Sequence, residues 1–226
     1  MCFSAEADFV SGAMIGTIGV ATLAKVKYPR EIPLAALPLA FATHQVIEGF
    51  VWRDVEVHTG SVSTPPVHLY LAFAWVVLPV LVPLAMLLVE PKGSRRRYAM
   101  TLLVGVGVLA TVLLAQPLVS GEVSAHAVGH SLRYEDSGSD AYAGTILYVL
   151  ATCAAPLLSS HRAIFWLGVA NLFAVAAVVA IQEEGLTSVW CTWAALVSVL
   201  ILVQFTWWRR AETPSEISSG AYGSTR

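Results

Sequence analysis

A histidine and a glutamate lie four residues apart within the apolar stretch 44–52, whose sequence is HQVIEGFVW. Residues separated by four positions share one face of an α-helix, so His44, Glu48 and Trp52 should point in the same direction. An imidazole and a carboxylate placed in this way can bind one Zn²⁺ or act as acid and base. The pair is therefore the first candidate for catalytic or metal-binding chemistry.

Three further histidines are candidate partners for this pair. His68 opens the third apolar segment, and the loop between the fourth and fifth segments contains SAHAVGHSLRY. This loop can be read as a short helix with Ser124 at its N-cap. Such a helix would align His126, His130 and Tyr134 on one face. Any of the three histidines would then help to complete a tetrahedral or open zinc site.

The same residues also fit interpretations without a metal. His44 and Glu48 can hold helices together through buried hydrogen bonds, although such contacts contribute only about 0.6 kcal/mol on average in membranes. They can equally form a proton relay or bind a ligand. Their spacing is not that of a zinc signature such as HExxH, and histidines in a loop often share no function.

Two of the three cysteines are predicted to lie on the outer side of a membrane. Cys2 is at the N-terminus, Cys191 begins the last apolar segment, and Glu6 lies at the same level. An oxidising outer compartment would allow a disulfide between Cys2 and Cys191. Removal of the initiator methionine would instead leave Cys2 as an N-terminal nucleophile or a bidentate metal ligand. Cys153 is read as a small packing residue.

The composition is that of a membrane protein. Of the 226 residues, 57% are hydrophobic and only 12% are charged, whereas soluble domains carry about 25% charged residues. No block of basic residues forms a soluble face, so nucleic acid is not an expected partner. The opening MCFSAEAD is acidic and precedes an apolar run long enough to span, so no cleavable signal peptide is predicted.

Seven apolar segments approach the length of about 20 residues that a membrane-crossing helix requires. We predict an all-α fold, an integral membrane bundle of seven transmembrane helices within residues 1–210. Pro79 and Pro83 should kink the third helix. Residues 211–226 should form a disordered cytoplasmic tail. The predicted spans are residues 9–26, 32–52, 67–89, 100–119, 142–158, 163–181 and 187–208.

The basic residues predict how the bundle is oriented. With seven spans, eleven of the thirteen Lys and Arg residues lie on one side, and only Arg53 and Arg133 lie on the other. Because basic loops remain in the cytoplasm, the N-terminus should be outside and the C-terminus cytoplasmic. The chain would then be a multi-pass protein of the cell membrane, with the lipid bilayer as a partner. The last segment has no lysine, so a retinal Schiff base is excluded.

Depth in the membrane gives the paired residues a common location. His44 should lie near the midplane, with Glu48 about 6 Å further out. Ionisable groups inside a membrane normally face the bundle interior or a wet cavity. We therefore expect both side chains to face a polar cavity that opens to the outside. A lipid-like or small polar ligand would suit such a cavity.

Two resemblances bear on function. MCFSAEADF and HQVIEGFVW resemble an uncharacterised bacterial and archaeal family of polytopic membrane proteins that start with MCFSA and carry an HQxxEGxxW motif on the second span. The span count and orientation are similar to those of alkaline ceramidases, which are seven-helix membrane hydrolases with a buried zinc site. This chain lacks their histidine pair on the last helix. The first resemblance implies a signature formed by Cys2, Phe3, Ser4, His44, Gln45, Glu48 and Gly49.

Three functions follow as hypotheses. The first is a membrane-embedded hydrolase that uses Zn or another divalent transition metal, with Glu48 and His44 as ligand or base. Its remaining ligands would be His68, His126 and His130. The second is a non-enzymatic binder, transporter or sensor of a small ligand or cation that uses the same cavity. The third is a purely structural membrane protein. The sequence does not decide whether the protein is an enzyme.

Overall fold

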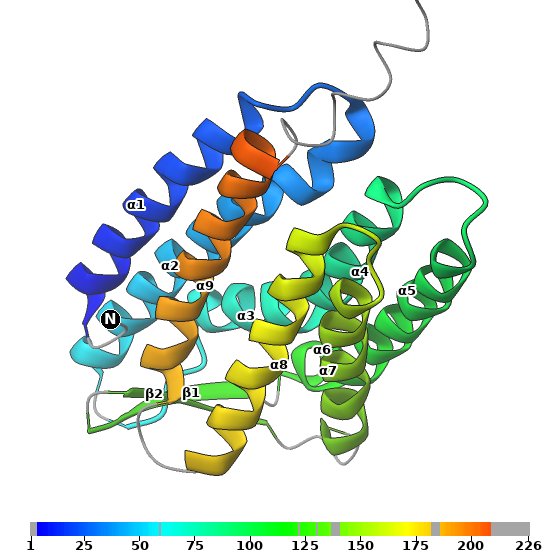
Figure 1. Cartoon of the computed structure of the whole chain (residues 1–226). Coiled ribbons are helices and arrows are strands. Elements are labelled where there is room, and N and C mark those ends of the chain that lie inside the picture. Colours follow the sequence, from blue (N-terminus) through cyan, green and yellow to red (C-terminus); the bar gives the residue numbers. More distant parts are fainter. Residues whose placement is uncertain are drawn as a thin grey trace, which may run out of the picture.

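The computed structural model describes residues 4–58, 60–121, 123–129, 131–136, 141–181 and 186–208. This part of the chain is mostly helical, with one small β-hairpin (Figure 1). Cys2, His130 and the predicted tail 211–226 lie outside the described residues. The helices are α1 (Ala5–Leu23), α2 (Ile32–Val57), α3 (Pro65–Ala72), α4 (Leu78–Val89), α5 (Arg95–Leu114), α6 (Gln116–Ser120), α7 (Ala141–Leu157), α8 (Arg162–Ile181) and α9 (Leu186–Val203).

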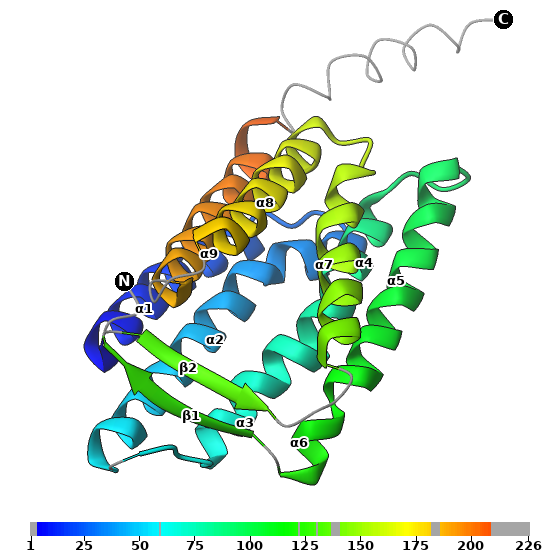
Figure 2. The same ribbon diagram turned by 90° about the horizontal axis from the view of Figure 1, so that it is seen from below.

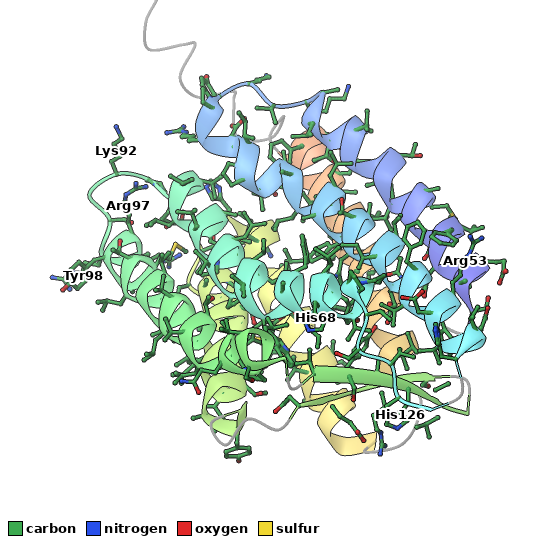
Figure 3. All side chains as sticks on the ribbon, turned by 180° about the vertical axis from the view of Figure 1, so that it is seen from behind. Arg53, His68, Lys92, Arg97, Tyr98 and His126 are labelled. Carbon is green, nitrogen blue, oxygen red and sulfur yellow. The ribbon has the colours of Figure 1, made fainter. Side chains whose placement is uncertain are left out.

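The long helices run alternately up and down the bundle. The connections α1–α2, α4–α5 and α7–α8 gather at one end, which we call the basic end (Figure 1). Lys92 and Arg97 mark this end, whereas His126 lies at the other end, on the hairpin (Figure 3). We call that second end the hairpin end. The alternation agrees with the predicted order of the apolar segments, each of which is a helix.

Three helical segments are long and apolar enough to cross a membrane: Pro29–Val57, Pro65–Val89 and Arg95–Ser120. The described residues also contain shorter apolar helices at Tyr142–Leu157, Ile164–Ala176 and Trp193–Thr206. The chain therefore has helices that are long and apolar enough to span a membrane, as the sequence predicts. An apolar core that includes Leu37, Met86 and Ile201 joins α2, α4 and α9 toward the basic end.

Helices α1 and α2 pack closely because small residues of α1 face α2. A Cβ atom at Gly12 would lie 2.9 Å from a methyl group of Val46, and one at Gly19 would lie 2.7 Å from Leu39. Helix α1 begins at Ala5, four residues before the predicted span, because the Ser4 side chain caps it by accepting from the Ala7 N–H at 3.3 Å. The early start brings the first carboxylates of the chain into a helix.

The helical segment Pro65–Val89 is interrupted by a π-helical turn at Phe73–Val77. The turn directly precedes Pro79, where the sequence predicts a kink, because proline cannot donate to the preceding turn. Helix α5 packs against this irregular backbone: a Cβ at Gly107 would collide with the Pro79 carbonyl oxygen. The Thr111 hydroxyl donates to the Val76 carbonyl at 3.2 Å, which satisfies one acceptor of the interrupted helix.

The predicted short helix at Ser124 is wrong, because this segment forms an antiparallel hairpin of β1 (Val123–Val128) and β2 (Ser131–Asp136). Gly129 has φ 61°, which suits a tight two-residue connection. The backbone of Ala125 also exchanges two hydrogen bonds of 2.8 Å with Val62. These tertiary backbone bonds favour the strand. Figure 2 shows the hairpin lying across the end of the bundle.

Candidate functional site

Two carboxylates from different helices meet at one amide. The Gln45 side-chain nitrogen donates to Asp8 Oδ1 and to Glu48 Oε2, the second bond measuring 3.3 Å. Exposed fractions are 0% for Asp8, 3% for Gln45 and 1% for Glu48, so all three groups are inside the fold. We call the two carboxylates, Asp8 and Glu48, the acid pair. Because neighbouring buried carboxylates repel each other, the pair favours a shared proton or a nearby positive charge.

Close packing of α1 on α2 positions the acid pair. Asp8 lies in the first turns of α1, on the same face as Gly12 and Gly19. Gly49, next to Glu48, leaves room for the Phe9 ring, which would lie 2.8 Å from an added Cβ. A larger side chain at Gly49 would push α1 away and separate Asp8 from Gln45.

Aromatic rings connect the acid pair to the rest of the site. His44 stacks on Tyr70, with ring centroids 4.0 Å apart, and on Phe73 at 5.0 Å. Tyr134 of the hairpin stacks on Tyr70 at 4.5 Å. The Tyr70 hydroxyl is hydrogen-bonded to the Glu48 carboxylate. Tyr70 therefore links helix α2, helix α3 and the hairpin, and covers the acid pair.

The hairpin places Tyr134 and His126 on opposite faces. Tyr134 is paired with Ala125 and His126 with Arg133, so the two side chains alternate across the strands. The inward face packs on the bundle through Val123, Ala125 and Leu132. Tyr134, on that face, has a pKa raised well above its usual range, chiefly because the packed ring would lose hydration as a phenolate. Tyr134 is therefore a neutral cover over the site.

A cavity of about 250 Å³ lies next to this ring stack. His44 is 6% exposed, and its Nδ1 has no hydrogen-bond partner among the described residues. A volume of this size can hold several waters, each of which takes about 30 Å³ in the liquid, or one small molecule. The cavity is lined by His44, Tyr70, Ala74, Trp75, Leu78, Leu114, Thr145 and Tyr148.

The two predicted histidines that the structure describes, His68 and His126, do not join His44 and Glu48. His68 Nδ1 bonds the Thr64 carbonyl at 3.0 Å, in the first turn of α3. His126 lies 3.9 Å from Glu135 on the far side of the hairpin (Figure 3). Within the described ranges, no group of three or more His, Cys, Asp or Glu residues could hold a metal ion. The predicted zinc ligands are thus not gathered by the part of the fold that is described.

The remaining predicted residues are separate from this site or not described. Glu6 is exposed in the first turn of α1. His130 and Cys2 lie outside the described residues, and Cys191 belongs to α9 at a position whose side chain is not described. Trp52 is buried, as its shared face with Glu48 predicts. The pairing of Cys2 with Cys191 therefore stays a prediction.

The sequence analysis did not assign Asp8 to the site. Gly12 and Gly19 could have indicated this assignment, because small residues on one face of a helix mark the side that packs closely against another helix. Tyr70 and Tyr148 were also missed. Nothing in their local sequence distinguishes them from ordinary core aromatics, and only the bend of the third helical segment brings Tyr70 to Glu48.

A second site built around a buried carboxylate lies at the basic end. Glu90 is 1% exposed, and its Oε2 accepts from the Ser160 N–H at 3.1 Å and from the Ser159 hydroxyl at 3.4 Å. Arg97 donates to the carbonyls of Leu87 and Glu90 at 2.7 and 2.9 Å. We call this group the Glu90 cluster. It ties the α7–α8 turn to the end of α4.

Residues 1–218 match the model of a family described as a family of unknown function (DUF6629). The chain belongs to this family. Neither a curated protein nor a solved structure matches it. The DUF6629 match extends over every helix and both strands described above, so it includes the acid pair, the cavity and the Glu90 cluster.

Proposed function

We propose that this DUF6629 protein is a seven-span protein of the cell membrane that binds a small polar ligand in the cavity beside His44. The N-terminus would be outside and the C-terminus cytoplasmic. The observation that carries the proposal is the cavity itself, which adjoins a buried histidine with an unpartnered ring nitrogen. The function is that of a non-enzymatic binder or transporter.

The arrangement of the helices supports the topology. In the described part of the chain, seven long helical segments alternate in direction (Figure 1). Lys92 and Arg97 lie at the end away from the hairpin (Figure 3). Because basic loops stay in the cytoplasm, the hairpin end would face outward, together with the cavity and the acid pair.

The geometry of the histidines favours ligand binding over metal-dependent hydrolysis. A catalytic zinc site needs about three protein ligands around one ion. His68 bonds its own helix terminus and His126 lies on the far side of the hairpin. His44 instead stacks between rings at the cavity wall. This is an arrangement for contacting a ligand rather than for holding an ion.

Accessibility of the cavity from outside tests the proposal. In a variant without its three native cysteines, Thr145→Cys places one thiol at the cavity wall, where Thr145 is exposed. A membrane-impermeant thiol reagent should label this variant in intact cells. Ser160→Cys, exposed at the basic end, is the matched control and should react only after the cells are permeabilised. The reverse pattern would contradict the orientation.

Metal content tests the alternative. Protein purified without chelator should carry no stoichiometric zinc or other transition metal by mass spectrometry. Metal bound to the wild type and lost from both His44→Ala and Glu48→Ala would favour the metal-dependent hydrolase instead.

A further inference from the structure

The cavity wall is unusually aromatic for its size. Of the eight described residues that line it, four carry aromatic or imidazole rings: His44, Tyr70, Trp75 and Tyr148. Tyr70 has ring partners on both faces, His44 at 4.0 Å and Tyr134 at 4.5 Å. Trp75 and Tyr148 are the other two aromatic rings of the described wall. Indole and phenol faces attract cations through the ring quadrupole.

The electrostatic surroundings also favour a positive charge. No lysine or arginine is among the described residues that line the cavity. The Glu48 carboxylate is hydrogen-bonded to the Tyr70 hydroxyl, and Asp8 is bound to the same amide as Glu48. The acid pair thus lies directly behind one wall residue. In a low-dielectric interior, such carboxylates attract a cation over several ångströms.

The ligand atoms that the wall offers do not suit a bare metal ion. Hard cations such as Ca²⁺ need six to eight oxygen ligands, and Zn²⁺ needs nitrogen or sulfur ligands in a cluster. The described lining residues supply three hydroxyls, from Tyr70, Thr145 and Tyr148, and one imidazole. An alkylated ammonium ion is weakly hydrated and needs only aromatic faces and nearby negative charge.

We propose that the cavity binds a small organic ammonium ion. This inference rests on the proposed function and names the class of ligand. The cationic group would lie between Trp75 and Tyr148. The unpartnered Nδ1 of His44 would bond a hydroxyl group of the ligand. A cavity of about 250 Å³ accommodates a molecule of the size of choline.

A comparison of two probes of equal shape tests this class. Calorimetric titration of the purified full-length protein in detergent should detect binding of choline. 3,3-Dimethylbutan-1-ol has the same shape, with carbon in place of the quaternary nitrogen, and should bind at least about tenfold more weakly. Equal affinity for the two probes, or no binding of choline, would overturn the inference.

Substitutions locate the binding site. Trp75→Leu and Tyr148→Leu should each weaken choline binding about tenfold, whereas Tyr148→Phe keeps the ring and should bind nearly as wild type does. Trp166→Leu is the matched control, because Trp166 is 53% exposed on α8, away from the cavity. Equal loss in the control and the cavity variants would also overturn the inference. Labelling of Thr145→Cys from outside does not depend on choline, so a failed ligand class remains distinguishable from a failed cavity.

Discussion

The acid pair and the Glu90 cluster are two buried carboxylate sites at opposite ends of one bundle. Glu48 and Glu90 are each 1% exposed, so burial alone does not distinguish them. Their partners do. Glu90 accepts from a backbone N–H and a serine hydroxyl in a turn, whereas Glu48 meets the side chains of Gln45 and Tyr70. A carboxylate bound to backbone fixes the chain, and one bound to side chains near a cavity remains available for chemistry.

Glu31 supports this distinction. It also lies at the basic end, and its Oε2 accepts from the backbone N–H groups of Lys27 and Tyr28 at 3.0 and 3.1 Å. These bonds hold the connection before α2, as Glu90 holds the connection between α7 and α8. Both glutamates accept from backbone N–H groups in the connections between helices. The cluster at the hairpin end has no such role in a chain turn.

The largest effect is expected for Glu90→Ala. Removal of the carboxylate leaves the Ser160 N–H and the buried Ser159 hydroxyl without their acceptor, and the free energy of unfolding should fall by about 3 kcal/mol. Glu90→Gln keeps an acceptor oxygen and should cost about 1 kcal/mol. Unfolding of both variants in detergent, followed by circular dichroism, measures the difference. Equal stability of Glu90→Ala and wild type would remove the structural role of this residue.

A somewhat smaller effect is expected for Arg97→Met. Arg97 supplies both donors to the last carbonyls of α4, so its loss should lower the free energy of unfolding by about 2 kcal/mol. Arg95→Met is the control, since Arg95 is exposed at the start of the same helix. The same unfolding measurement applies. Equal free energies of unfolding for the two variants would show that the hydrogen bonds of Arg97 do not stabilise the fold.

Glu48→Gln should separate function from stability. The substitution removes the repulsion between Glu48 and Asp8, so the free energy of unfolding should change by less than about 1 kcal/mol. Affinity for choline should fall about tenfold, because Glu48 can then no longer carry negative charge behind Tyr70. Calorimetry and unfolding on the same preparation measure both. A loss of stability as large as that of Glu90→Ala would show that Glu48, like Glu90, has a structural role.

The smallest effect is expected for Thr111→Val. Thr111 makes one neutral hydrogen bond to the Val76 carbonyl, so the free energy of unfolding should fall by about 0.6 kcal/mol. Thr101→Val on the same helix removes a bond within α5 only and is the control. The difference between these variants gives the baseline for a single bond, against which both carboxylate sites can be judged.

The hairpin shows where local sequence was insufficient. Ser124, His126 and His130 have a spacing that fits a helical turn as well as a strand. The strand is preferred because Ala125 bonds the backbone of Val62, which lies more than sixty positions earlier in the chain. Spacing within the segment carries no information on that contact. The helical interpretation therefore placed His126 on the same face as Tyr134. It also missed the contact between Tyr134 and Tyr70.

The sequence by itself determined the helical segments, their order and the burial of His44 and Glu48. These follow from apolar length and from the four-residue spacing, which are local properties of the chain. Only the tertiary structure decided that Asp8 joins Glu48 through Gln45, that Tyr70 covers them and that a cavity lies beside His44. Those contacts depend on the close approach of α1 to α2, on the π-helical turn before Pro79 and on the hairpin. Each arises from packing between distant segments, which spacing along one segment does not encode.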